Sequence, residues 1–239
     1  MTMSKKSFKC ILVIPDQHFP YHHKHIFKFL KAVKAKYKPD KVVNLGDELD
    51  LHSMSFHNHS ANLPGPHDEM GMAISSLKVL YKIFPEVDIL ESNHGSLVYR
   101  RAEANGLPKR VLMTYNQILE APKGWRWHSD LVLYGSDGNP IYFCHGMSSD
   151  SLKNSKNRSM SFISGHWHSK FEIRYWANSL NLYWGVISGC LIDYKSMAFD
   201  YGRTMLDKPI LGCTIVRNGH PILIPMILDK NGSWTGKLP

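Results

Sequence analysis

Five short apolar runs, each followed within three residues by Asp, Asn or His, constrain the fold of this chain most strongly. Runs of four or five residues rich in Val, Ile and Leu are typical of buried strands. In open α/β sheets the carboxyl ends of such strands meet at one edge, so residues far apart in the sequence are expected to gather there. The runs and the residues that follow them are Cys10–Ile14 with Asp16 and His18, Lys41–Leu45 with Asp47 and Asp50, Val87–Leu90 with Asn93 and His94, Ile141–Cys144 with His145, and Met160–Ser164 with His166 and His168.

Helix-like and strand-like segments alternate in the first half of the chain. Residues 25–37 and 69–84 both space their apolar side chains at helical intervals, which indicates crossover helices between parallel strands. After residue 125 the pattern changes to short runs of branched and aromatic residues. Turn sequences separate these runs, such as Ser136-Asp137-Gly138-Asn139 and Arg217-Asn218-Gly219-His220, which are typical of hairpins.

Length and composition favour an ordinary globular chain. At 239 residues it can bury a full core, and we expect one domain over residues 1–239, with a polar, frayed end from about residue 230. No run approaches the ~20 apolar residues of a membrane span, and no apolar stretch of signal-peptide length follows the first lysines. These features predict a cytoplasmic protein without a membrane part. The four cysteines read as reduced core residues, and they are Cys10, Cys144, Cys190 and Cys213.

The residues after the strands offer a mixture of carboxylate, imidazole and amide oxygen. That mixture suits borderline and hard divalent ions, so we expect two ions, with Mn favoured in vitro and Fe, Zn, Mg or Ni as alternatives. Two ions about 3.5–4 Å apart can clamp a phosphate and lower the pKa of a bridging water towards ~7. No cysteine falls at these positions, which argues against a thiolate zinc site.

The ordered set closely resembles the calcineurin-like metallophosphoesterase superfamily. That family's pattern is Asp-x-His, Gly-Asp-x-x-Asp, Gly-Asn-His-Asp/Glu, His and Gly-His-x-His, and the match runs from residue 10 to about residue 170. Two positions depart from it. Ser92 stands where the family usually has Gly, and Gly95 stands where it usually has an acidic residue, which puts any role of that carboxylate in doubt.

The resemblance implies a fold and a set of metal ligands. The fold is a four-layer α/β/β/α sandwich of two mixed sheets flanked by helices, with the metals at one edge. Because residues two apart in an extended segment point the same way, Asp16 with His18 and His166 with His168 are expected to aim their side chains together, and Trp167 to point away. The implied ligands are Asp16, His18 and His168 for the first metal, Asn93, His145 and His166 for the second, and Asp47 as the bridge.

Two further residues are implied to act on the substrate. His94 is not a ligand in the family, and it resembles the group that donates a proton to the leaving oxygen or holds the phosphate. Asp50 would orient His94 through a hydrogen bond from the imidazole to the carboxylate.

The sequence favours diesters over monoesters. Phosphoprotein phosphatases of the superfamily usually carry Arg after the second Asp of Gly-Asp-x-x-Asp, and here Leu51 follows Asp50. They also generally lack the second imidazole of Gly-His-x-His, whereas this chain has both His166 and His168. We therefore expect a phosphodiesterase or nuclease that acts on DNA, RNA or a nucleotide-type diester through a metal-bridging hydroxide. The alternatives are a phosphomonoesterase, on a small substrate or a phosphoprotein, and a metal-retaining scaffold protein with weak catalysis.

Candidate substrate contacts come from charge and from loop position. The net charge of +9 favours polyanions, although lysines on exposed helix faces are equally common without such a partner. Residues 52–67 show no regular period and follow Asp50 directly, as a lid or specificity loop would. The candidate contacts are Lys153, Lys156 and Arg158 after His145, Arg100 one turn after His94, and His57 and His59 in the loop.

Overall fold

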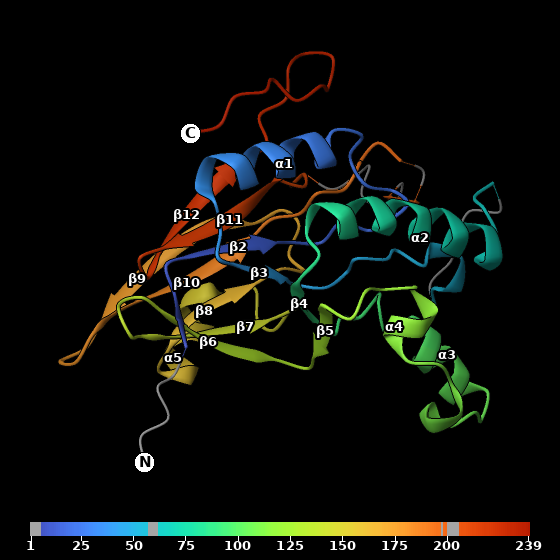
Figure 1. Cartoon of the computed structure of the whole chain (residues 1–239), viewed down its shortest axis with the longest axis horizontal. Helices are drawn as coiled ribbons and strands as arrows, with labels where there is room; N and C mark the ends of the chain where they lie inside the picture. The colour runs from blue at the N-terminus through green and yellow to red at the C-terminus, as the bar shows by residue number, and fades with distance from the viewer. Residues whose placement is uncertain (1–5, 57–61, 197, 200–205) are drawn as a thin grey trace.

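Two six-stranded sheets lie face to face between helices. The computed structural model describes residues 6–56, 62–196, 198–199 and 206–239. On the outer face of the first sheet lie α1 (Ile26–Tyr37) and α2 (Pro66–Ile83), and α5 (Ser151–Arg158) lies on the second (Figure 1). This order of layers is α/β/β/α, so the predicted fold class is confirmed.

The first sheet has the strand order β12-β11-β2-β3-β4-β5. Strands β2, β3, β4 and β5 are parallel, as the alternation of strands and helices predicts. Strand β11 pairs antiparallel with β2, and β12 pairs antiparallel with β11. The sequence pattern does not predict β5, because Arg126 and His128 alternate with its two tryptophans and break the apolar run. The bounds are β2 (Cys10–Ile14), β3 (Lys41–Asn44), β4 (Val87–Leu90), β5 (Trp125–His128), β11 (Gly212–Arg217) and β12 (His220–Pro225).

The second sheet has the order β1-β6-β7-β8-β10-β9. Both predicted hairpins form, since β6 pairs antiparallel with β7 and β11 with β12. The short helices α3 (Leu97–Ala104) and α4 (Tyr115–Ile118) follow β4. The strand bounds are β1 (Ser7–Phe8), β6 (Leu131–Gly135), β7 (Pro140–Cys144), β8 (Ser161–Ser164), β9 (Phe171–Ala177) and β10 (Leu182–Ser188).

Each face of β2 contributes to a different apolar layer. Ile11 and Val13 lie between the two sheets with Phe143, whereas Leu12 packs under the helices against Phe29. All five side chains are fully buried. A continuous apolar strand is therefore required here, because a strand with both faces covered has no polar side.

Five strands end at the edge that the sequence pattern predicts. In the first sheet Ile14 pairs with Asn44, so the residues after β2 and β3 leave the sheet side by side. In the second sheet Cys144 pairs with Ser164 in the same way. The loops after β2, β3, β4, β7 and β8 thus converge from both sheets.

The C-terminal segment packs on α1, so the prediction of a frayed end is wrong. The ring centroid of Trp234 lies 5.6 Å from that of Phe29, and Leu238 also packs against the core under the helix. The hydroxyl of Tyr37 donates to the carbonyl of Pro239 at 3.0 Å. Two apolar side chains within a polar segment are enough to fix it, and composition alone overlooks them.

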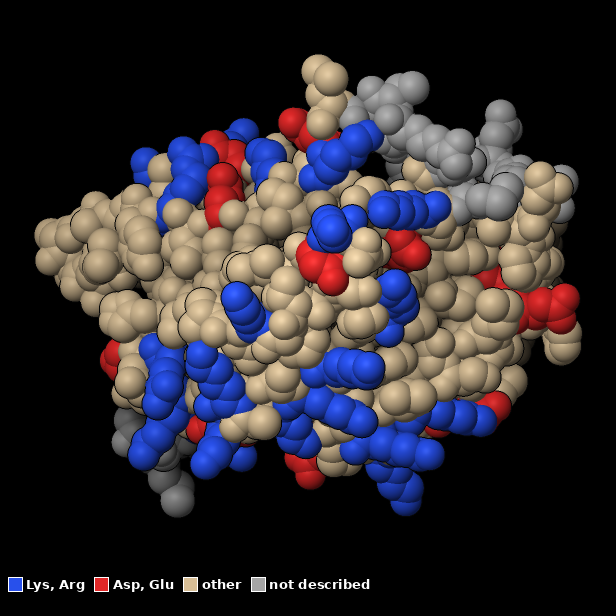
Figure 2. Space-filling view, turned by 90° about the horizontal axis from the view of Figure 1, so that it is seen from above, with Lys and Arg blue, Asp and Glu red and all other residues tan. Residues whose placement is uncertain are grey.

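Basic side chains gather on the face that the helices cover. Figure 2 looks onto this side, and lysine and arginine outnumber the acidic residues on it. Helix α1 contains no acidic residue at all, and its exposed lysines include Lys28, Lys31 and Lys34. None of these lysines lines a cavity beside the converging loops in the described part of the chain.

No helix among the described residues is long and apolar enough to cross a bilayer.

A buried carboxylate joins three strands of the first sheet. Asp88 accepts from Arg126 Nε at 2.9 Å and from His128 Nε2 at 2.8 Å, and it pairs with the ammonium of Lys41. Burial raises the pKa of Asp88, but Arg126, Lys41 and His128 outweigh it and lower the pKa to about 2. The ionised form is therefore favoured in the folded state.

We predict that Asp88→Asn destabilises the protein by about 2 kcal/mol at pH 7. Because the folded pKa is depressed, this stabilisation is present above the unfolded value near 3.8 and is lost as the pH falls through about 2. The difference between wild type and variant should therefore shrink on acidification, as measured by urea unfolding with a chelator present. Glu103→Gln, at an exposed carboxylate in α3, is the control. An equal difference at pH 7 and pH 2 would contradict the electrostatic account.

Candidate metal centre

The backbone turns sharply where the strands end. His18, Asp47 and His166 have φ values of 51°, 45° and 69°, in the left-handed region that residues with a side chain seldom adopt. After His166 the chain forms a turn in which Trp167 N donates to the carbonyl of Gly165 at 2.8 Å. These segments are not extended, so the alternation argued from the sequence does not apply. The turns themselves direct the side chains.

Glycine is required at two of these turns. Gly46 has a φ of 91°, and a Cβ there would lie 2.7 Å from the carbonyl oxygen of Leu90. A Cβ on Gly165 would lie 2.2 Å from the Asp16 carboxylate. Both glycines let neighbouring loops approach closely, which brings the side chains from the two sheets within reach of one another.

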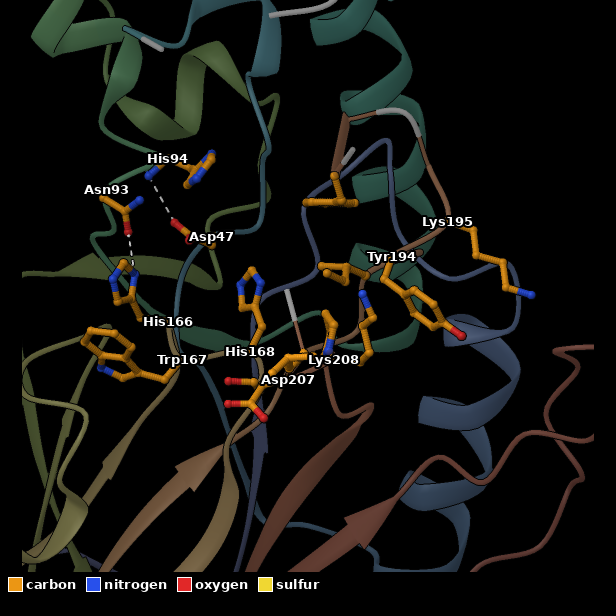
Figure 3. A pocket seen from close by; sticks show the side chains of 15 residues that line it. Asp47, Asn93, His94, His166, Trp167, His168, Tyr194, Lys195, Asp207 and Lys208 are labelled. Atoms are coloured by element: carbon orange, nitrogen blue, oxygen red, sulfur yellow. Dashed lines mark hydrogen bonds between the residues drawn. The ribbon is translucent and has the colours of Figure 1, made fainter. Parts of the chain in front are cut away.

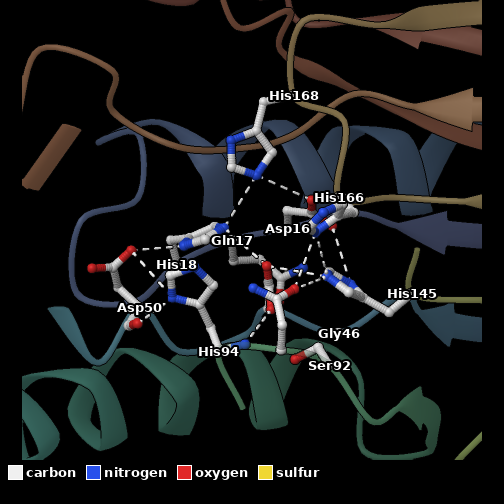
Figure 4. A network of polar contacts seen from close by, with 12 residues as sticks. Asp16, Gln17, His18, Gly46, Asp50, Ser92, His94, His145, His166 and His168 are labelled. Carbon is white, nitrogen blue, oxygen red and sulfur yellow. Dashed lines mark hydrogen bonds and ion pairs between the residues drawn. The ribbon is translucent and has the colours of Figure 1, made fainter. Parts of the chain in front are cut away.

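One group of side chains comes from β2, β3 and β8. His18 Nε2 lies 3.2 Å from His168 Nε2 and 3.4 Å from Asp47 Oδ2. Asp16 Oδ2 lies 3.2 Å from His168 Nε2 and accepts from the backbone N–H of His166 at 2.6 Å. In the group Asp16, His18, Asp47 and His168, each residue offers a ligand atom within 4.8 Å of the others (Figure 4).

A second group adjoins the first. His145 Nε2 lies 3.2 Å from Asp47 Oδ2 and 2.7 Å from Asn93 Oδ1. His166 Nδ1 lies 3.1 Å from the same Asn93 oxygen and 3.3 Å from His145 Nε2. Asp47 Oδ2 therefore faces both groups, and the other oxygen, Oδ1, accepts from the backbone N–H of His94 at 3.0 Å. The seven side chains lie together in the two groups that the resemblance implies, and their binding of metal stays a prediction.

The donor set fits divalent cations. Two imidazole nitrogens 3.2 Å apart, as in His18 and His168, repel through their lone pairs unless a proton or a cation lies between them. Asp16 Oδ1 is buried without a hydrogen-bond partner among the described residues. Buried polar atoms of this kind are costly unless something pairs with them.

The electrostatics point the same way. Burial raises the pKa of Asp47, but the surrounding histidines, His145 foremost, hold it well below its usual range. Burial lowers the pKa of His145, yet Asp47 and then Asp16 raise it to about 9. Without metal the cluster thus draws a proton onto His145, because buried carboxylates favour a positive charge beside them.

Hydrogen bonds set the tautomers of two histidines. His18 Nδ1 donates to Asp50 Oδ1 at 2.7 Å, and His145 Nδ1 donates to the carbonyl of Leu45 at 2.9 Å. In the neutral form of both rings, which is the form that binds a metal, the lone pair is left on Nε2, which faces Asp47. This arrangement of a metal-directed nitrogen held by a hydrogen bond at the other nitrogen is typical of metal sites.

Asp50 does not orient His94 in the way predicted. Its carboxylate oxygen lies 4.0 Å from His94 Nδ1 and is already bound to His18, whereas the backbone carbonyl of Asp50 accepts from His94 Nδ1. His18, Asp50 and His94 lie close enough together to count as a third possible ligand group, but these hydrogen bonds use the Nδ1 atoms of both rings. The carboxylate of Asp50 positions His18, and its main chain positions His94.

Another carboxylate fills the space beside Gly95. A Cβ on Gly95 would lie 3.2 Å from both oxygens of Glu48. Burial raises the pKa of Glu48 to about 7. The acidic group that the family pattern leads one to expect at position 95 is thus replaced in space by the acidic residue after Asp47.

A cavity of about 900 Å³ opens beside both groups, and Figure 3 shows the side chains that line it. His94 and His168 line it, and so does Trp167, which is only half-buried. Tyr194 and Lys195 lie on the side opposite the ligand histidines in Figure 3, and Lys208 also lines the cavity. Sequence analysis missed all three because they follow β10 without any motif. Their only sequence signal is an irregular segment between two strands.

The candidate substrate contacts that the structure describes lie at different distances from the two ligand groups. Arg100 Nη1 donates to the carbonyl of Asn93 at 3.1 Å, which places this guanidinium beside the second group. Lys153 and Lys156 are exposed on α5 and line neither described cavity of the centre, and the guanidinium of Arg158 lies 4.0 Å from the ring centroid of Tyr142. His57 and His59 lie outside the described residues.

Comparison with known proteins adds little to this geometry. No protein-family model matches the chain, and neither does any curated protein. Among solved structures, Vps29 from Chaetomium thermophilum has a TM-score of 0.49 at 14% identity, covering 95% of this chain and 93% of that one. Vacuolar protein sorting 29 from Cryptosporidium parvum has a TM-score of 0.49 at 15% identity, covering 98% and 96%.

A third similar structure is YfcE, described as a phosphoesterase from E. coli. Its TM-score is 0.43 at 12% identity, with 95% of this chain and 96% of that chain covered. Similarities of this size assign neither a family nor an activity. The resemblance to the metallophosphoesterases therefore depends on the ordered motif and on the two groups of ligands.

We predict that Asp47→Asn weakens both metal sites while Asp16→Asn chiefly weakens one, because Asp47 is the one described residue whose carboxylate belongs to both groups. Calorimetric titration with Mn²⁺ and metal analysis should show about two ions per wild-type chain and at least tenfold weaker binding of both in Asp47→Asn, as roughly expected when a charged ligand is lost. Asp207→Asn, at a carboxylate that lines the cavity outside both groups, is the control. Two undisturbed binding events in Asp47→Asn would show that another residue bridges.

Proposed function

We propose that this protein is a phosphoesterase that depends on two divalent metal ions and prefers diesters. The observation that carries the proposal is the shared Asp47 carboxylate, which faces two groups of ligand atoms next to His94 and a large cavity. Bound at these groups, the ions would neutralise a phosphate and supply a nucleophile from water near neutral pH. The residues of the chain account for the remaining needs of the reaction.

His94 is suited to protonate the leaving oxygen. Its Nδ1 donates to the carbonyl of Asp50, so Nε2 is left for a substrate, and its side chain lines the cavity. Burial lowers the pKa of His94, but the carboxylates of Asp47 and Asp50 outweigh it and raise the pKa above its usual value. A raised pKa keeps the imidazolium populated at neutral pH, although cations bound at Asp47 would oppose this effect.

The charge around the centre favours a diester. Leu51 is fully buried at the position where phosphoprotein phosphatases carry arginine, and no arginine lines the larger cavity among the described residues. A monoester carries almost two negative charges, and a forked guanidinium would help to hold it. A diester carries one charge and needs less cationic support beyond the metals.

The test is hydrolysis of matched nitrophenyl esters after reconstitution with Mn²⁺. Bis(4-nitrophenyl) phosphate should be cleaved with a higher kcat/KM than 4-nitrophenyl phosphate, by about tenfold or more if one missing charged contact separates them. A chelator should abolish both activities. A preference for the monoester would favour the phosphomonoesterase, and two bound ions without turnover of either ester would favour a scaffold.

We predict that His94→Asn leaves the metal content unchanged and lowers kcat by about 10²–10⁴, the usual effect of losing a positioned general acid. The loss should be large for a dinucleotide, whose alkoxide leaving group needs a proton, and small for bis(4-nitrophenyl) phosphate, whose nitrophenolate does not. His220→Asn, at an exposed histidine of β12, is the control. If His94→Asn empties a metal site or slows both esters equally, His94 is a ligand or a phosphate clamp.

A further inference from the structure

Two cavities adjoin the metal centre, one on each side of the second ligand group. The larger, of about 900 Å³, includes His94 and His168. The smaller, of about 530 Å³, includes His145 and lies against the same group. Both are lined by Asn93 and His166, so these two side chains separate them. A phosphate held at the centre would have open space on two sides.

The larger cavity suits an organic leaving group. Trp167 and Tyr194 line it with Ile192, and these aromatic and apolar surfaces match a planar ring such as a nucleobase. Lys195 lies at the side opposite the ligand histidines in Figure 3. Because His94 lines this cavity and not the smaller one, the leaving oxygen would lie on this side.

The smaller cavity suits an anion. Serines line it together with Arg100, whose Nη1 donates only to the backbone carbonyl of Asn93 among the hydrogen bonds of the described residues. No carboxylate of the described residues pairs with Arg100, and Glu91, which shares the cavity, lies 3.7 Å from Lys109 instead. A guanidinium fixed at one N–H keeps its other donors for a ligand, and phosphate oxygens match that fork.

The neighbouring arginine provides a contrast. Arg101 donates to the carbonyls of Met54 and Ser55, and its guanidinium lies 4.0 Å from the ring centroid of Phe56. Arg101 thus holds the loop after β3 to α3. Arg100 also lies near Phe56, with its guanidinium 5.3 Å from the ring centroid, but its one hydrogen bond among the described residues is to the carbonyl of Asn93 beside the centre. Only Arg100 is placed to meet a substrate.

We propose that the substrate is a nucleotide chain that extends to both sides of the metal centre. Its leaving nucleoside would lie in the larger cavity, and the next phosphate along the chain would be held by Arg100 in the smaller one. This inference rests on the proposed diesterase function. It assigns Arg100 as a specificity residue, because a diester without a second phosphate cannot use this contact.

The experiment compares three thymidine dinucleotides, TpT, pTpT and TpTp, in the Mn²⁺-reconstituted full chain. Only one of the two phosphorylated isomers can place its extra phosphate at Arg100, and which one depends on the direction of the chain in the site. That isomer should exceed TpT in kcat/KM by about tenfold or more, the value of one charged hydrogen-bonded contact. The other isomer should gain much less.

Arg100→Gln should reduce the ratio between the favoured isomer and TpT to near one. Arg110→Gln, at an exposed arginine that lines neither described cavity, should retain the wild-type ratio. The inference is overturned if neither isomer gains over TpT, or if the gain persists in Arg100→Gln. Cleavage of bis(4-nitrophenyl) phosphate separates this inference from the proposed function. If metal-dependent cleavage is seen but the Arg100 effect is not, the diesterase proposal holds and the second phosphate contact is wrong. If no cleavage is seen, the proposed function itself fails.

Discussion

The carboxylate of Asp47 is the interaction on which the rest of the centre depends. One of its oxygens lies 3.4 Å from His18 and 3.2 Å from His145, so histidines from both sheets meet at a single atom. The side chain is almost fully buried beside a second buried carboxylate, Asp16. Two such charges so close together are unfavourable unless positive charge accompanies them. A proton or a cation among the histidines therefore stabilises this edge of the sandwich.

The fold supplies this position through its backbone. Parallel strands bring the loops to one edge, but left-handed turns at His18, Asp47 and His166 decide where the side chains point. Strained backbone of this kind costs about 1–3 kcal/mol per residue and persists where the surrounding structure requires it. Here the buried apolar layers on both faces of the first sheet provide that support.

Sequence reasoning predicted most of the elements, and the side chains that it expected as ligands do lie together, because both leave local signals. A buried strand such as β2 has an unbroken apolar run, and metal ligands are a few residue types that follow such runs. The contacts that it missed depend on the path of the chain in space. The hydrogen bond of Asp50 to His18 and the place of Glu48 beside Gly95 join loops whose relative position no spacing encodes. The cavity wall at Tyr194 likewise belongs to a segment without regular pattern.

Asp50 accepts one hydrogen bond from an expected metal ligand, His18, and one from the proposed proton donor, His94. Its carboxylate fixes the tautomer of His18, and its main-chain carbonyl accepts from His94, so one residue holds a ligand and the proposed proton donor together. Replacing the side chain removes the first contact and one of the charges that raise the pKa of His94, whereas the hydrogen bond from His94 to the carbonyl remains. Substitution of Asp50 should therefore affect the metal site first, whereas His94 keeps its position as long as the loop keeps its conformation. This division follows from the two acceptors of one residue, its side-chain carboxylate and its main-chain carbonyl.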